Sequence, residues 1–193
     1  MDDGDDFLRR LGRIHRAFHT SGHRVLESIV KTSTEMLRDR MCPNVRTSDR
    51  PLKDLLAGRP IVSSDTTNVF VHTEDKVGVK FARTIVEQSD GKLAVCVSID
   101  GPTAFTKNEF QNRSIQFMSC KSLCVNVTRH ELVPKHRLLE GDPPHEKHRL
   151  PLIMETDAVV QYYHWPVGSV VEIERVFTGD EPVPYLRLVS ASS

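Results

Sequence analysis

The chain has 193 residues, of which 38% are apolar and 27% charged, with 26 basic and 26 acidic side chains. This length suits one large domain or two small ones, and the composition is ordinary for a protein that buries a core. No apolar run approaches the roughly 20 residues that a membrane-spanning helix needs. Residues 1–6 lack the basic start and apolar centre of a signal peptide. We therefore expect a reducing compartment and four free thiols, at Cys42, Cys96, Cys120 and Cys124.

The charges cancel overall but are unevenly distributed along the chain. Residues 7–128 contain 19 Lys and Arg against 12 Asp and Glu, whereas residues 129–193 contain 7 against 10. A mildly basic first part and a mildly acidic second part are compatible with a first domain that faces nucleic acid and a second that faces protein.

An amphipathic helix is predicted at the N-terminus, where four apolar residues recur at helical spacing: Phe7, Leu11, Ile14 and Phe18. Three arginines form a stripe along another side of this helix: Arg9, Arg13 and Arg16. A solvated helix face is one interpretation of the stripe, and long-range attraction to nucleic acid is the other. A second helix is expected to end near Arg40, followed over 41–67 by turns with one short helix at 52–57.

Strand and helix patterns alternate from residue 68 onward. Apolar, β-branched runs bounded by turn residues predict strands at 69–71, 93–99 and 125–128. Helical spacing predicts helices between them, at 77–86 and 108–118. This alternation is typical of a parallel or mixed sheet with helices packed against it.

Pro134 marks the predicted joint between two domains, because proline lacks a backbone N–H and pushes Val133 towards an extended conformation. Beyond it, Thr156 or Asp157 can cap a short helix at 158–164, and two strand patterns predict a hairpin, at 170–177 and 185–189. The predicted fold class is therefore α/β and α+β in two domains. An N-terminal α/β domain with a mixed sheet covers residues 1–124, and a small C-terminal α+β domain with a hairpin covers 125–193.

Motifs for catalysis, nucleotide binding or metal binding are not found in the sequence. His130 and Glu131 begin like the zinc-protease pattern His-Glu-x-x-His, but Pro134 stands at its fifth position and excludes the helix that the pattern requires. Cys120 and Cys124 lack a second pair at zinc-finger spacing. We therefore predict no catalytic residue, no metal and no cofactor. Two alternatives remain: a metal-dependent hydrolase using His130, Glu131 and His136, and a free nucleic-acid-binding module using the arginine stripe.

The stretch from Asn126 to His136, Asn-Val-Thr-Arg-His-Glu-Leu-Val-Pro-Lys-His, is long and compositionally unusual. It resembles the domain joint of the fifth subunit shared by the eukaryotic nuclear RNA polymerases, a family that also has archaeal members. Weaker similarities occur on both sides in the order of that family: Lys76-Val77-Gly78-Val79-Lys80, Leu150-Pro151, Asp157, Tyr162, Gly168, Val170-Val171 and Arg187-Leu188-Val189. The resemblance covers roughly residues 68–189.

This resemblance implies a non-catalytic subunit of a DNA-dependent RNA polymerase in the nucleus, or in the nucleolus if it is specific to the ribosomal RNA polymerase. The first domain would form part of the lower jaw near downstream DNA, and the second would be an assembly domain docked on the largest subunit. The implied partners are the largest subunit, other polymerase subunits and downstream duplex DNA, bound weakly and without sequence preference. No membrane partner is implied.

The resemblance also implies site residues. Those expected at the partner interface are His130, Glu131, Leu132, Val133, Pro134, Lys135, His136, Tyr162, Arg175 and Arg187. Those expected near DNA are the arginine stripe and a loop similar to the Thr-Pro-Ser-Ala segment of the jaw domain: Arg9, Arg13, Arg16, Pro102, Thr103 and Ala104.

Four residues depart from the family, which usually carries Arg or Lys at their positions: Gln161, Pro166, Val167 and Glu172. At a contact, such a change of charge excludes wrong partners, whereas on an exposed face it is drift. The first interpretation predicts a paralogue that serves one polymerase, or a viral or deeply divergent homologue.

Overall fold

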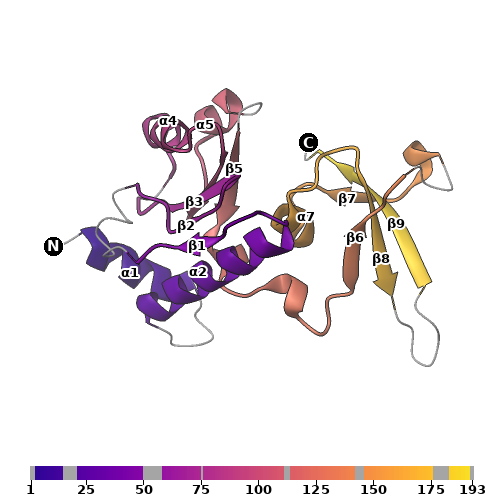
Figure 1. Cartoon of the computed structure of the whole chain (residues 1–193), viewed down its shortest axis with the longest axis horizontal. Helices are drawn as coiled ribbons and strands as arrows, with labels where there is room; N and C mark the ends of the chain where they lie inside the picture. Colours follow the sequence, from indigo (N-terminus) through magenta and orange to yellow (C-terminus); the bar gives the residue numbers. More distant parts are fainter. Residues whose placement is uncertain are drawn as a thin grey trace. The chain divides into compact units, whose positions relative to one another are not determined.

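The computed structural model describes residues 3–14, 21–49, 58–74, 76–110, 114–141, 146–175 and 183–191. The chain divides into two compact units, Met1–Val125 and Asn126–Ser193. Each contains helices and a mixed sheet of its own (Figure 1), which confirms the predicted fold class. Among the helices of the described ranges, none is long and apolar enough to cross a membrane.

Two helices open the first unit, as the apolar spacing predicts: α1 (Asp3–Ile14) and α2 (Gly22–Asp39). Phe7 and Leu11 of α1 are buried, and the Ser21 hydroxyl caps α2 by accepting a hydrogen bond from the Arg24 N–H. The two helices pack so closely that a Cβ on Gly22 would lie 1.9 Å from the carbonyl oxygen of Leu8. Phe18 and the helix predicted at 52–57 fall outside the described residues.

The sheet of the first unit has the order β1-β2-β3-β4-β5, antiparallel from β1 to β3 and parallel from β3 to β5. Its strands are β1 (Arg46–Thr47), β2 (Val62–Ser63), β3 (Thr67–Val71), β4 (Leu93–Ser98) and β5 (Ile115–Ser119). Two helices, α4 (Val79–Gln88) and α5 (Ala104–Glu109), lie above these strands in Figure 1, with α1 and α2 below. Phe70, Ala82 and Cys96 are part of the core between sheet and helices.

Three sequence predictions for the first unit and the joint are wrong. Residues 115–118 form strand β5 rather than a helix, because Ile115–Ser119 pairs with β4 and completes the parallel sheet. Residues 41–67, expected to hold turns, also contribute strands β1 and β2. Residues 125–128, expected to form a strand, follow helix α6 (Cys120–Leu123) and enter the 3-10 helix η1 (Val127–Arg129) instead, because Asn126 Oδ1 accepts the Thr128 N–H at 3.0 Å and starts a helical turn.

In its described residues, the second unit is a four-stranded sheet with one α-helix against it. The strand order is β6-β8-β9-β7, with a parallel β7–β9 pair and otherwise antiparallel pairs. The elements are β6 (Lys135–Leu138), a 3-10 helix η2 (Lys147–Arg149), β7 (Leu152–Met154), α7 (Ala158–Tyr163), β8 (Val170–Arg175) and β9 (Val183–Ser190). The predicted helix and hairpin are confirmed, whereas the edge strands β6 and β7 were not predicted. The Asp157 carboxylate caps α7, and Val160 packs on Val171, Ile173 and Val189.

Candidate partner and nucleic-acid surfaces

The joint motif folds as a tight turn that presents a leucine to solvent. The ring of His130 accepts a hydrogen bond from the Leu132 N–H at 3.2 Å, and the His130 carbonyl accepts one from the Val133 N–H at 3.0 Å. His136 closes the other end, with its ring Nδ1 2.7 Å from the Pro134 carbonyl oxygen. The side chain of Leu132 is left 80% exposed. The hydrogen bonds of the turn therefore fix the backbone at Leu132 and expose its apolar side chain to solvent.

The remaining predicted partner residues of the motif divide by exposure. Glu131 and Lys135 are exposed, whereas Val133 and Pro134 are half-buried. The two histidine rings are engaged with the main chain of the turn. Among the described residues, no three His, Cys, Asp or Glu side chains lie together as metal ligands would. This arrangement gives no support to the hydrolase alternative built on His130, Glu131 and His136.

Tyr162 lies inside the second unit, so its expected place at a partner interface is corrected. The side chain is buried, and its hydroxyl accepts a hydrogen bond from Asn126 Nδ2 at 3.1 Å. Asn126 Oδ1 accepts in turn from the N–H and the hydroxyl of Thr128, at 3.0 and 2.7 Å. These bonds fix the start of the unit to helix α7. The family-like residues Asn126 and Tyr162 therefore stabilise the packing of the start of this unit on α7.

The two predicted arginines of the C-terminal hairpin differ in their surroundings. Arg175 is exposed, and its guanidinium lies 5.3 Å from the centre of the Tyr185 ring. Arg187 is half-buried and donates from Nη1 to the carbonyl oxygen of Leu152 at 3.0 Å. Arg175 is thus accessible to a partner, while Arg187 joins β9 to β7.

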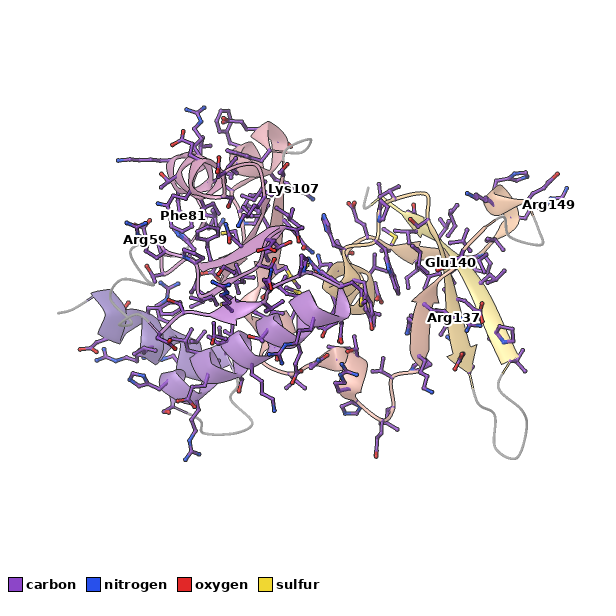
Figure 2. The ribbon with its side chains drawn as sticks, viewed as in Figure 1. Arg59, Phe81, Lys107, Arg137, Glu140 and Arg149 are labelled. Atoms are coloured by element: carbon purple, nitrogen blue, oxygen red, sulfur yellow. The ribbon has the colours of Figure 1, made fainter. Side chains whose placement is uncertain are left out.

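Glu172 is not an exposed change of charge, which corrects the interpretation made from the sequence. Arg137, which Figure 2 labels on β6, lies opposite Glu172 in the β6–β8 register. Glu172 Oε1 accepts a hydrogen bond from Arg137 Nη2 at 2.6 Å. The residue is only 9% exposed. This hydrogen bond raises the pKa of the Arg137 guanidinium. Pro166 and Val167 are exposed, so they remain as departures from the family on the surface.

The arginine stripe of α1 is only partly described. Arg9 and Arg13 are exposed, and Arg16 lies outside the described residues. Sequence reasoning missed the neighbouring Arg10, whose guanidinium makes hydrogen bonds within the first unit. Arg10 donates to the Thr73 carbonyl at 3.4 Å and to Asp100 Oδ2 at 3.3 Å, at the ends of strands β3 and β4. Arg10 therefore attaches α1 to the sheet, and its neighbours are the ones that face solvent.

The loop that resembles the jaw segment caps helix α5. The Thr103 hydroxyl accepts the Thr106 N–H at 3.1 Å, and the Thr106 hydroxyl donates to the Val77 carbonyl at 3.0 Å. Pro102 is bridged to Val77, so the loop is fastened to the segment before α4. Ala104 and the next residue, Phe105, are exposed, Phe105 by 71%. An exposed aromatic side chain directly after the family-like segment is the signal that sequence reasoning overlooked.

Comparison with known proteins decides the family. The sequence profile described as "RNA polymerase Rpb5, C-terminal domain" matches residues 125–189. The "DNA-directed RNA polymerases I, II, and III subunit RPABC1" of Caenorhabditis briggsae is 27% identical over 91% of this chain and 93% of its own length. The chain belongs to the Rpb5 family. The "DNA-directed RNA polymerases I, II, and III subunit rpabc1" of Dictyostelium discoideum is 31% identical over 58% of this chain and 66% of its own length. The "DNA-directed RNA polymerase V subunit 5A" of Arabidopsis thaliana is 28% identical over 65% of this chain and 64% of its own length.

Rpb5 is a non-catalytic subunit, and the catalytic site of the polymerase lies in other subunits. Burial shifts the pKa of several ionisable groups in the first unit. Burial lowers the pKa of His72, whose ring lies 3.2 Å from the Lys76 carbonyl oxygen, and so favours the neutral ring. Burial raises the pKa of the Cys96 and Cys120 thiols to about 12, which keeps both protonated and unreactive.

The Rpb5 match covers nearly all of the second unit together with its joint motif. Within the matched range, the family-like residues have two kinds of position. Asn126, Asp157 and Tyr162 make internal hydrogen bonds, whereas Leu132 faces solvent. Folding alone accounts for the first kind.

Proposed function

We propose that this chain is a structural subunit of a nuclear DNA-dependent RNA polymerase, without catalytic residues of its own. The observation that carries the proposal is the Rpb5 match over residues 125–189, which falls on a unit with its own sheet and core. The relatives support it, since they are named as polymerase subunits and the first aligns over 93% of its length. A subunit of the ribosomal RNA polymerase would be nucleolar.

In this proposal the second unit is the assembly domain that docks on the largest subunit. The joint turn supports this role, because Leu132 is displayed by hydrogen bonds that fix its backbone. An exposed, preorganised apolar side chain gains free energy by entering a pocket and loses little conformational entropy. Glu131 and Lys135 flank it as polar rim residues, and Arg175 is a further accessible contact.

The first unit is proposed to form part of the lower jaw beside downstream DNA. Arg9 and Arg13 are exposed on α1, and the Pro102–Ala104 loop ends at the exposed Phe105. A few basic side chains attract the phosphate backbone weakly and without regard to sequence, with a shallow dependence on salt. The DNA contact is therefore proposed to add to the affinity supplied by protein contacts.

The chain is further proposed to serve one polymerase. The relatives allow this, since the Arabidopsis subunit is named for polymerase V whereas the RPABC1 subunits are named for polymerases I, II and III. Pro166 and Val167 support it as exposed residues at positions that are usually basic in the family. Glu172 does not, because Arg137 neutralises it within the chain.

Affinity purification of the tagged full-length chain, with identification of the co-purifying largest subunits, tests this function. One largest subunit is expected. Recovery of no polymerase subunit would refute the function itself. Recovery of all three nuclear largest subunits in comparable amounts would mean that the chain is an ordinary shared subunit. That result would refute only the restriction to one polymerase.

A further inference from the structure

The sheet of the second unit has two edge strands, β6 and β7, and they differ in how their outer main-chain groups are satisfied. On β7 these groups belong to Leu152 and Met154, since the hydrogen bonds to β9 use Pro151 and Glu155. The Leu152 carbonyl accepts from Arg187 Nη1 at 3.0 Å, and the Met154 carbonyl accepts from the Asp157 N–H at 2.9 Å. The outer carbonyls of β7 are therefore already occupied within the chain.

Strand β6 is open. The Leu139 N–H donates to the Val170 carbonyl at 2.9 Å, which fixes the alternation along the strand. Lys135 and Arg137 direct their main-chain groups at β8, and His136 and Leu138 direct theirs outward. Within the described ranges, the N–H and C=O of His136 and Leu138 have no hydrogen-bond partner. The Leu138 side chain is 42% exposed.

We propose that β6 is a docking edge, on which an extended segment of another polymerase subunit adds a fifth strand to this sheet. The inference rests on the proposed function and deepens it by naming the mode of contact. Strand addition gives partners to all four outward main-chain groups of His136 and Leu138. The contact would then depend on backbone hydrogen bonds in addition to the side chains of the joint turn.

The side chains beside this edge define the chemistry of the added strand. Leu138 and His136 lie on one face of the sheet, opposite Val171 and Ile173, and Arg137 lies on the other. Directly opposed side chains of neighbouring strands come within about 4.5–5.5 Å between Cβ atoms. The added segment therefore carries apolar residues on the face of Leu138 and an acidic or polar residue opposite Arg137.

A second copy of this chain is a poor occupant of the edge. An antiparallel pair of β6 strands that uses both outward-facing residues places His136 of one copy opposite Leu138 of the other. The same register places Arg137 opposite Arg137 on one face of the sheet. Each guanidinium is exposed on one side and paired with its own Glu172 on the other, so the two gain no attraction from each other, whereas an acidic or polar residue opposite Arg137 would add one. The charge on β6 thus favours a different chain whose residue at that point is acidic or polar.

Amide hydrogen exchange tests the proposal on the full chain, free and within the purified polymerase. The His136 and Leu138 amides should exchange rapidly in the free chain and at least about tenfold more slowly in the polymerase. Unchanged exchange in the assembled polymerase would overturn the strand addition and leave the proposed function standing. Failure of the chain to assemble with any polymerase would overturn both. Slow exchange in the free chain that depends on its concentration would assign the edge to a second copy and overturn the proposal.

A matched pair of proline variants provides a second measurement. Leu138→Pro and Met154→Pro each remove an N–H that faces away from the sheet, and an edge strand tolerates proline at such positions. Leu138→Pro should lower the recovery of the largest subunit about tenfold, whereas Met154→Pro should leave it near the unsubstituted level. Equal recovery with both variants would overturn the proposal. If Leu138→Pro lowers the Tm of the free chain, the amide exchange of the unsubstituted chain is the measurement that tests the docking edge.

Discussion

Glu172 on β8 lies directly opposite Arg137 on β6, and their side chains form a hydrogen-bonded ion pair of 2.6 Å. The pair links the edge strand to the centre of the sheet. Glu174 is a looser neighbour, at 3.9 Å from Arg137 Nη1. The residue that departs from the family's basic pattern is thus accommodated inside the chain by Arg137.

Restoring a basic residue at position 172 should therefore destabilise the second unit. Glu172→Lys places two positive charges opposite each other at a buried position, and the Tm of the full chain should fall by roughly 5–10 °C. Glu174→Lys, at the more exposed carboxylate, should have a smaller effect. The charge swap Arg137→Glu with Glu172→Arg should recover most of the loss. Thermal unfolding checks all three, and equal Tm values for Glu172→Lys and the unsubstituted chain would contradict the pairing.

The close crossing of α1 and α2 should make Gly22 sensitive to any side chain. A Cβ at this position would lie 1.9 Å from the Leu8 carbonyl oxygen, so Gly22→Ser forces the helices apart and should cost about 2–4 kcal/mol of unfolding free energy. The matched control is Gly78→Ser. Gly78 caps α4, and a Cβ there meets nothing within 4 Å, so serine should be neutral or slightly stabilising. Urea unfolding of both variants measures the difference, which would be absent if the helices were loosely packed.

The fold was predictable from the sequence where a local pattern determines the element. The strand at 93–98 and the helix beginning at residue 79 follow from apolar runs and spacing, and Asp157 caps α7 as its position indicated. The short strands β1, β2, β6 and β7 have two to four residues each and arise from pairing with a neighbour, so no local pattern marks them. The site was less predictable. The exposure of Leu132 depends on a turn closed by the His130 ring, and the Arg137–Glu172 pair joins residues 35 positions apart.

The buried His72 should make the stability of the first unit depend on pH. Its pKa is lowered by burial, so the folded chain favours the neutral ring more than the unfolded chain does. Its contribution is complete above the unfolded pKa of about 6.5 and is lost as the pH falls below that value towards the lowered folded pKa. Urea unfolding at pH 7.5 and 5.5 should show this loss. His72→Gln should reduce the difference in unfolding free energy between the two pH values, whereas His148→Gln, at an exposed position, should leave that difference unchanged. An equal difference in both variants would argue against His72 as its source.

Leu132 should be an energetic centre of docking without being needed for folding. Leu132→Asp removes the apolar side chain that the joint turn presents and should reduce recovery of the largest subunit about tenfold or more. Met41 is 86% exposed in the first unit, so Met41→Asp is a control of similar exposure that should leave recovery unchanged. Both variants should unfold within about 0.5 kcal/mol of the unsubstituted chain. Loss of recovery in both variants alike would remove the special role of the turn.

The most direct measurement of the central claim starts from the polymerase. The enzyme is purified through its largest subunit, and this chain is quantified in the complex by mass spectrometry against the other subunits. If the chain is a structural Rpb5-family subunit, its amount should be equimolar with that of the largest subunit of the polymerase it serves. The chain should also remain bound through a high-salt wash that removes DNA. Absence of the chain from every nuclear polymerase, or recovery at a small fraction of the largest subunit, would contradict the account.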